Sequence, residues 1–145
     1  MRLVVQRVSR SEVRVGGQRV ASGGPGLVIL VGIGRDDAED QPARMAEKVA
    51  NLRIFEDEDG KMNRSIVDVG GEAVVVSQFT LYGDTSRGRR PSWITAAAPE
   101  VADPAVERFA AALSSRGIPV QSGVFGAHME VELVNDGPVT LVLEA

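Results

Sequence analysis

Apolar and polar residues alternate over the first twenty positions, a pattern typical of strands with one buried face. The alternating apolar positions are Leu3, Val5, Val8, Val13, Val15 and Val20. The Gly16-Gly17 pair that follows Val15 predicts a hairpin turn. Residues 27–31 and 73–76 are short, continuously apolar runs, so each predicts a strand that is covered on both faces.

A first helix is predicted to begin near Asp40, which can cap it, with Pro42 in the first turn where its missing N–H costs little. Its apolar stripe recurs at helical spacing and consists of Met45, Val49 and Leu52. The polar stretch that follows, with Asp57, Asp59 and Gly60, predicts a turn.

A second helix is predicted to begin with Asp103 as its cap and Pro104 at the first helical position. Its apolar stripe consists of Val106, Phe109, Ala110 and Leu113. Gly117 and Pro119 are expected to end it.

The last thirty residues return to the strand pattern. Apolar residues at 129, 131 and 133 alternate with Glu130 and Glu132, which predicts a strand with one face in water. Residues 135–138 are expected to break this strand before a second apolar run at 139–143. The order of elements predicts one α+β domain over residues 1–145, with a curled, mixed or largely antiparallel sheet and two main helices.

Composition limits what this domain can be. Hydrophobic residues make up 43% and charged residues 25% of the 145 positions, which is usual for globular proteins. The first residues leave no apolar core for a signal peptide, and no run approaches the roughly 20 apolar residues of a membrane helix. We therefore expect a cytoplasmic protein. With no cysteine, it has neither disulfides nor a catalytic thiolate.

The net charge of −4 argues against a surface coated in positive potential, so any RNA contact has to be local. One segment suits such a contact, because it gathers Arg87, Arg89 and Arg90 within six residues. The alternative interpretation is an ordinary solvated loop.

Several catalytic devices are excluded or disfavoured by the residue inventory. A Ser-His-Asp triad needs a histidine, and His128 is the only one. Its position beside Met129, on the predicted strand with one wet face, favours a solvent-facing or sheet-edge residue. One histidine and no cysteine also make a zinc site improbable.

Two polar segments remain as candidates. Ser77-Gln78-Phe79-Thr80-Leu81 directly follows a buried apolar run, as a strand does when it leaves the core for a pocket rim. Its backbone N–H groups could hold a polarised carbonyl oxygen, the main task in acyl transfer. Composition alone favours a plain strand end. Asn135-Asp136-Gly137-Pro138-Val139-Thr140 is, on pattern alone, a turn between two strands.

These two segments resemble the signature motifs of the D-aminoacyl-tRNA deacylases. The resemblance extends over nearly the whole chain and rests on the number, order and spacing of further short motifs. These are Val5-Gln6-Arg7-Val8, Leu52-Arg53-Ile54-Phe55-Glu56-Asp57, Gly60-Lys61-Met62-Asn63, Arg90-Pro91-Ser92 and Gly123-Val124-Phe125-Gly126-Ala127. Neither signature departs from the family pattern.

The resemblance implies a homodimer with its active sites at the subunit interface. A cis Gly137-Pro138 dipeptide would enter the partner's pocket, and its carbonyl oxygens would clash with the Cβ of an L-amino acid. D-aminoacyl-tRNA would be accepted, as would glycyl-tRNA, which has no Cβ to exclude. Arg7 would brace the two carbonyls, although on sequence alone it is an ordinary strand arginine. The implied partner is aminoacyl-tRNA, with no DNA, membrane, cofactor or metal.

The expected chemistry is substrate-assisted hydrolysis, in which the ribose hydroxyl next to the ester helps a water molecule to attack the ester carbonyl. The protein then mainly orients the substrate and stabilises the oxyanion. Ser77, Gln78, Phe79 and Thr80 are the candidate catalytic residues, mainly through backbone N–H groups. Thr80 as a nucleophile ranks lower because no base is evident. Met129 either lines the pocket or packs in the core, and Trp93 is expected in the core.

Two other functions remain open at this point. A non-catalytic nucleic-acid-binding dimer would use the same basic loop and would bind without turnover. A general esterase would cleave simple D-amino acid esters as well as the tRNA conjugates.

Overall fold

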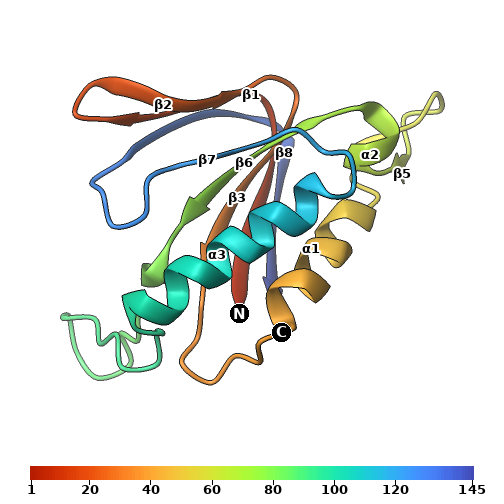
Figure 1. Ribbon diagram of the computed structural model, residues 1–145. Helices are drawn as coiled ribbons and strands as arrows, with labels where there is room; N and C mark the ends of the chain where they lie inside the picture. Colours follow the sequence, from red (N-terminus) through yellow and green to blue (C-terminus); the bar gives the residue numbers. More distant parts are fainter.

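In the computed structural model, which describes all 145 residues, a six-stranded mixed sheet carries two long helices on one face (Figure 1). The strands are β1 (Arg2–Val15), β2 (Gln18–Gly23), β3 (Gly26–Gly32), β6 (Glu72–Ser77), β7 (Val120–Ser122) and β8 (Glu130–Glu144), with a separate pair β4 (Phe55–Glu56) and β5 (Met62–Arg64). The helices are α1 (Gln41–Asn51), α2 (Ile66–Val69), α3 (Pro99–Ser114) and the 3₁₀ helix η1 (Phe79–Tyr82).

The fourteen-residue strand β1 organises the sheet. On one side it pairs antiparallel with β3 and then with β2, while β8 runs antiparallel along its other side. β3, β6 and β7 are parallel to one another. The free end of β2 bends back toward this parallel part, where Ser22 N–H donates to Gln121 Oε1 at 2.8 Å and Gly24 N–H to Glu72 Oε2 at 2.8 Å. The predicted α+β class and curled, mixed sheet are therefore confirmed.

The core has two parts, one on each face of the sheet. α1 and α3 cover one face, where Met45 and Phe109 pack against strand residues such as Ile29. The opposite face, inside the curl, holds a second cluster composed of Val8, Val13, Ala21, Val28, Val74 and Val76. β3 and β6 contribute to both clusters, so the prediction that both strands are covered on two faces is confirmed.

The predicted start of the second long helix is wrong. α3 begins at Pro99, not at Pro104, and Asp103 is not its cap. The buried face of the helix extends one turn further toward the N-terminus through Ala102, and Pro99 takes the favoured first position instead. Pro104 lies inside the helix and is exposed, where it costs one backbone hydrogen bond.

Two further differences concern caps. Asp40 precedes α1 as expected, but its side chain makes no capping hydrogen bond and lies 3.7 Å from the guanidinium of Arg44. The short helix α2 was not anticipated, although its reciprocal capping box, formed by Ser65 and Asp68, is a local sequence signal.

Residues 135–138 do not end the last strand, as the sequence pattern had suggested. β8 continues from Glu130 to Glu144, and its pairing with β1 jumps from Val8–Asn135 to Gln6–Thr140. The intervening residues form a bulge opposite Arg7. The strand also begins later than predicted, so that His128 and Met129 lie in the preceding loop.

Candidate active site

A cavity of about 560 Å³ opens where the C-terminal ends of β3 and β6 meet the N-terminal end of α3. Most of its lining is apolar and includes the buried residues Val31, Val76 and Val106. Pockets of this size and composition hold small molecules or parts of larger ones. Its polar lining comes from only a few positions, and these include the first of the two candidate segments.

Ser77, Gln78 and Phe79 line this cavity. β6 ends at Ser77, and Gln78 N–H still donates to Val31 O at 2.8 Å, which keeps the turn attached to β3. η1 then begins at Phe79 and leads the chain out of the sheet. Thr80 is exposed and outside the lining, but its Oγ1 accepts a hydrogen bond from Gln78 Nε2. Three of the four predicted catalytic residues are thus brought together at the pocket rim.

The placement of Trp93 in the core is a prediction that the structure contradicts. Trp93 is 39% exposed and lines the cavity, with its ring edge-on to that of Phe79 at a centroid distance of 5.2 Å. The ring fits here because residue 83 is a glycine, whose added Cβ would lie 2.7 Å from Trp93 Cζ3. The two aromatic side chains form one rim of the pocket.

The opposite wall comes from the loop before β8. Phe125, His128 and Met129 line the cavity there, with Val131 at the start of the strand. Met129 also packs against the second core cluster, so it serves both of the roles considered for it. His128 is exposed and makes no hydrogen bond, which agrees with a solvent-facing residue. Sequence reasoning did not assign Phe125 and His128 to the site, although Phe125 belongs to a family-like motif.

Gly137 and Pro138 lie outside this cavity, on the surface of β8, and both are exposed. The peptide bond between them is cis. Asn135 closes the bulge from within, because its Nδ2 donates to Arg7 O and to Val139 O, each at 2.9 Å. The dipeptide is therefore presented outward on a braced loop.

Arg7 supports that loop from beneath. Its side chain is buried, and it donates from Nε to Asp136 O at 3.1 Å and from Nη1 to Ile54 O at 2.7 Å. The carbonyl that Arg7 holds is that of Asp136, the residue before the dipeptide, and no bond to the Gly137 or Pro138 carbonyl is formed.

The loop between Asp84 and Ser92 presents the three arginines. Asp84 and Ser92 exchange two backbone hydrogen bonds of 2.9 Å, which close the loop. Hydrogen bonds from Ser86, first from its side chain and then from its backbone N–H, lower the pKa of Asp84. Arg87, Arg89 and Arg90 are exposed and form no ion pair, so their charges are free for a partner. Trp93 follows directly, which places the loop beside the pocket rim.

No group of three metal-ligating side chains converges anywhere in the chain. The polar groups around the cavity are backbone amides, the hydroxyl of Ser77, the carboxamide of Gln78 and the imidazole of His128. The backbone amides can orient a substrate and hold a developing oxyanion. None of the helices combines the length and the apolar composition that crossing a bilayer requires.

Fold and pocket together define an α+β protein with an apolar recess beside a strand end that is suited to acyl transfer. The chain belongs to the D-Tyr-tRNA(Tyr) deacylase family, whose model matches residues 4–144. It is 56% identical over 145 residues to a D-aminoacyl-tRNA deacylase of Thermus aquaticus, covering 100% of this chain and 95% of the relative. It is 59% identical to one of Roseiflexus sp. (strain RS-1), covering 100% and 94%.

Two solved structures share the fold. The structure of a c-Myc DNA Unwinding Element Binding Protein superposes with a TM-score of 0.93 at 39% identity, over 100% of this chain and 99% of the other. The structure of a probable eukaryotic D-amino acid tRNA deacylase superposes with a TM-score of 0.81 at 19% identity, over 98% and 97%. The family resemblance inferred from the motifs is confirmed, and with it the expectation that the chain is a deacylase.

Proposed function

We propose that this protein hydrolyses the ester bond between tRNA and a D-amino acid or glycine, releasing free tRNA in the cytoplasm. The observation that carries this proposal is the cavity at the end of β6, whose rim is formed by Ser77, Gln78 and Phe79. The recess accepts an apolar group, and the rim offers polar backbone to the ester beside it.

The oxyanion is held by backbone N–H groups. Because Gln78 N–H already donates to Val31 O, the candidates narrow to the N–H groups of Phe79 and Thr80. These are the first two residues of η1, so they have no acceptor within that helix. The ribose hydroxyl next to the ester assists the attacking water, because Ser77, Gln78 and Phe79 offer no base, while His128 lies in the opposite wall of the cavity and is exposed.

Chirality is enforced by a dipeptide from a second subunit. Gly137 and Pro138 are exposed, braced by Arg7 and Asn135, and outside the cavity of their own chain, as a group that serves another chain would be. β8 bonds only to β1 and exposes Val134 and Val142, apolar side chains that a second subunit could cover in a homodimer. Carbonyl oxygens at this position would exclude an L-Cβ, while glycine has none to exclude.

Arg87, Arg89 and Arg90 bind the phosphates of the tRNA backbone. Replacing all three by serine removes positive charge that no acidic side chain offsets, so the KM for aminoacyl-tRNA should rise. The slope of log(kcat/KM) against log salt concentration should become shallower, because up to about three fewer counterions are released on binding. Steady-state kinetics between low and moderate salt measure both effects, and an unchanged salt dependence would remove the loop from the tRNA site.

One assay tests the whole proposal. The purified protein is incubated with matched D- and L-aminoacyl-tRNA and then with a D-amino acid methyl ester, and hydrolysis of each is measured. Hydrolysis of the D-aminoacyl-tRNA alone is the expected result. Equal cleavage of both hands contradicts the chirality mechanism, and cleavage of the methyl ester indicates a general esterase. Binding without turnover indicates a nucleic-acid-binding protein, a function for which the name of the 39% identical solved structure gives a reason to test.

A further inference from the structure

We propose that Arg2 is a positioning residue that holds η1 in place and thereby aligns the rim of the active site. This inference rests on the proposed oxyanion role of Phe79 and Thr80, and its test includes a measurement that needs no substrate. Arg2 lies at the start of β1, far in sequence from the segment that it holds.

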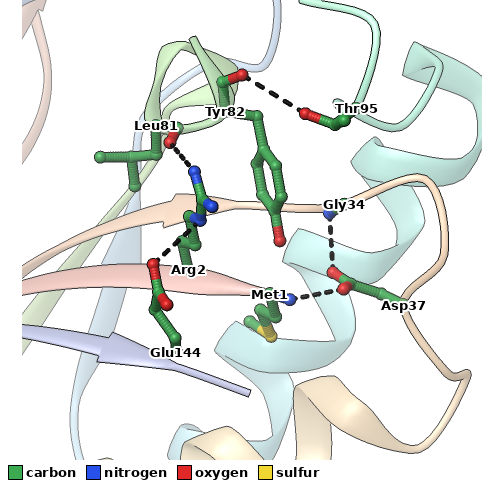
Figure 2. Close-up of polar contacts among 8 residues, drawn as sticks. All are labelled: Met1, Arg2, Gly34, Asp37, Leu81, Tyr82, Thr95 and Glu144. Atoms are coloured by element: carbon green, nitrogen blue, oxygen red, sulfur yellow. Dashed lines mark hydrogen bonds and ion pairs between the residues drawn. The ribbon is translucent and has the colours of Figure 1, made fainter. Parts of the chain in front are cut away.

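Three contacts hold the Arg2 side chain (Figure 2). Nη1 donates to Leu81 O at 2.9 Å, within η1. The guanidinium carbon lies 4.7 Å from the centre of the Tyr82 ring, a cation–π contact. Nε lies 3.1 Å from Glu144 Oε1, at the end of β8. The side chain therefore ties the first and last strands of the sheet to η1.

η1 depends on such outside contacts because its own hydrogen bonds are few. It is four residues long, and its ends are closed by Leu81 N–H donating to Gln78 O and Gly83 N–H donating to Thr80 O. Short 3₁₀ helices have poorer hydrogen-bond geometry than α-helices. The C-terminal half of η1 carries Leu81 and Tyr82, which Arg2 contacts, and the N-terminal half carries Phe79, which lines the cavity.

Tyr82 offers Arg2 a fixed surface. Its ring lies against Gly34, where an added Cβ would be 2.6 Å from the phenol oxygen. Asp37 anchors that loop, because it accepts from Gly34 N–H at 2.7 Å and pairs with the Met1 ammonium at 2.5 Å (Figure 2). Burial, followed by the charge of Asp37, raises the pKa of Tyr82 to about 12, so the phenol stays neutral. The ring face is therefore the part of Tyr82 that Arg2 uses.

Removing Arg2 should let η1 shift, and Trp93 reports such a shift. Trp93 is the single tryptophan and lies edge-on to Phe79, the first residue of η1. A displacement of about 1 Å at a reacting group can lower a rate up to about a hundredfold. Loss of the contacts between Arg2 and η1 should therefore reduce kcat more than it raises KM.

The experiment compares Arg2→Met, Arg2→Lys and Arg19→Met in the full chain. Arg19 is an exposed arginine on β2 with no ion pair or side-chain hydrogen bond, so its replacement is the matched control. With D-tyrosyl-tRNA, Arg2→Met should lower kcat about ten- to a hundredfold while KM stays within about twofold. Arg2→Lys keeps a cationic donor for Leu81 O and should recover part of the loss.

Trp93 fluorescence, measured without substrate, should change in Arg2→Met and not in the control. Unchanged kcat in Arg2→Met overturns the proposal, as does a loss confined to KM or a lysine variant no better than methionine. An unchanged fluorescence spectrum overturns it as well. If the wild-type protein cleaves both hands of substrate, the chirality mechanism fails while these measurements still decide the role of Arg2.

Discussion

Arg7 shows how much depends on a single buried charge. It is 6% exposed, and its guanidinium donates hydrogen bonds to two backbone carbonyls. One is that of Ile54, in the loop before β4, and the other is that of Asp136, in the bulge of β8. A buried cation is tolerated only where its donors find partners. At this scale the side chain connects the core to the exposed dipeptide.

Arg7→Met should therefore lower the free energy of unfolding. The substitution keeps the apolar stem but leaves the Ile54 carbonyl without its donor, a loss of about 1–3 kcal/mol. Urea denaturation followed by circular dichroism measures the change, with Arg19→Met as the exposed control. A variant as stable as the control would contradict the bracing role.

Trp93 marks the limit of residue-level prediction. Tryptophan side chains are highly buried on average, and nothing in the sequence neighbours of Trp93 distinguishes a core from a rim position. What places it at the rim is the space left by Gly83 and the approach of Phe79 from another segment. Both are tertiary facts that a local pattern does not contain.

Among the elements, the strands followed their hydrophobic period closely. The runs that became β3 and β6 were placed to within one or two residues, because continuous burial on both faces leaves a clear apolar signal. The breaks were less predictable. Pro104 and residues 135–138 look like boundaries, yet α3 and β8 pass through them. α3 continues because Ala102 and Ala105, on either side of Pro104, are buried, and β8 continues because both of its halves pair with β1.

Pro104→Ala should stabilise α3. Residue 104 is exposed, and an alanine N–H could donate to the carbonyl of Glu100, which the proline leaves without an intrahelical partner. A helix-interior proline costs about 3 kcal/mol, partly offset by its stiffening of the unfolded chain, so we expect a gain of about 1–3 kcal/mol. Thermal unfolding measures the change. A lower Tm would mean that the proline is favoured by packing at this position.

At the scale of the whole molecule, the proposed site has two parts, and a single chain keeps them separate. The sequence motifs predicted both parts, the rim at 77–80 and the dipeptide at 137–138. No local pattern could reveal that the dipeptide lies outside the cavity of its own chain, because that depends on the path of β8 along β1.

Mixing two defective variants tests whether the parts meet across a dimer. Phe79→Ala damages the cavity, and Gly137→Ala damages the dipeptide, because at φ +132° an added Cβ lies 2.9 Å from Val139 Cγ2. Each variant alone should deacylate poorly. After co-refolding at equal amounts, heterodimers contain one intact composite site, so about a quarter of wild-type activity should return. No recovery would mean that each site is built within one chain.

The bulge in β8 also interrupts the free edge of that strand. A fifteen-residue strand bonded on one side only offers a row of unpaired amides and carbonyls to any extended chain, which is how edge-to-edge aggregation begins. At residues 136–139 that row is interrupted, and Pro138 has no amide hydrogen to contribute. The bulge thus divides a long free edge into two short ones, which lowers the risk that another extended chain pairs with it.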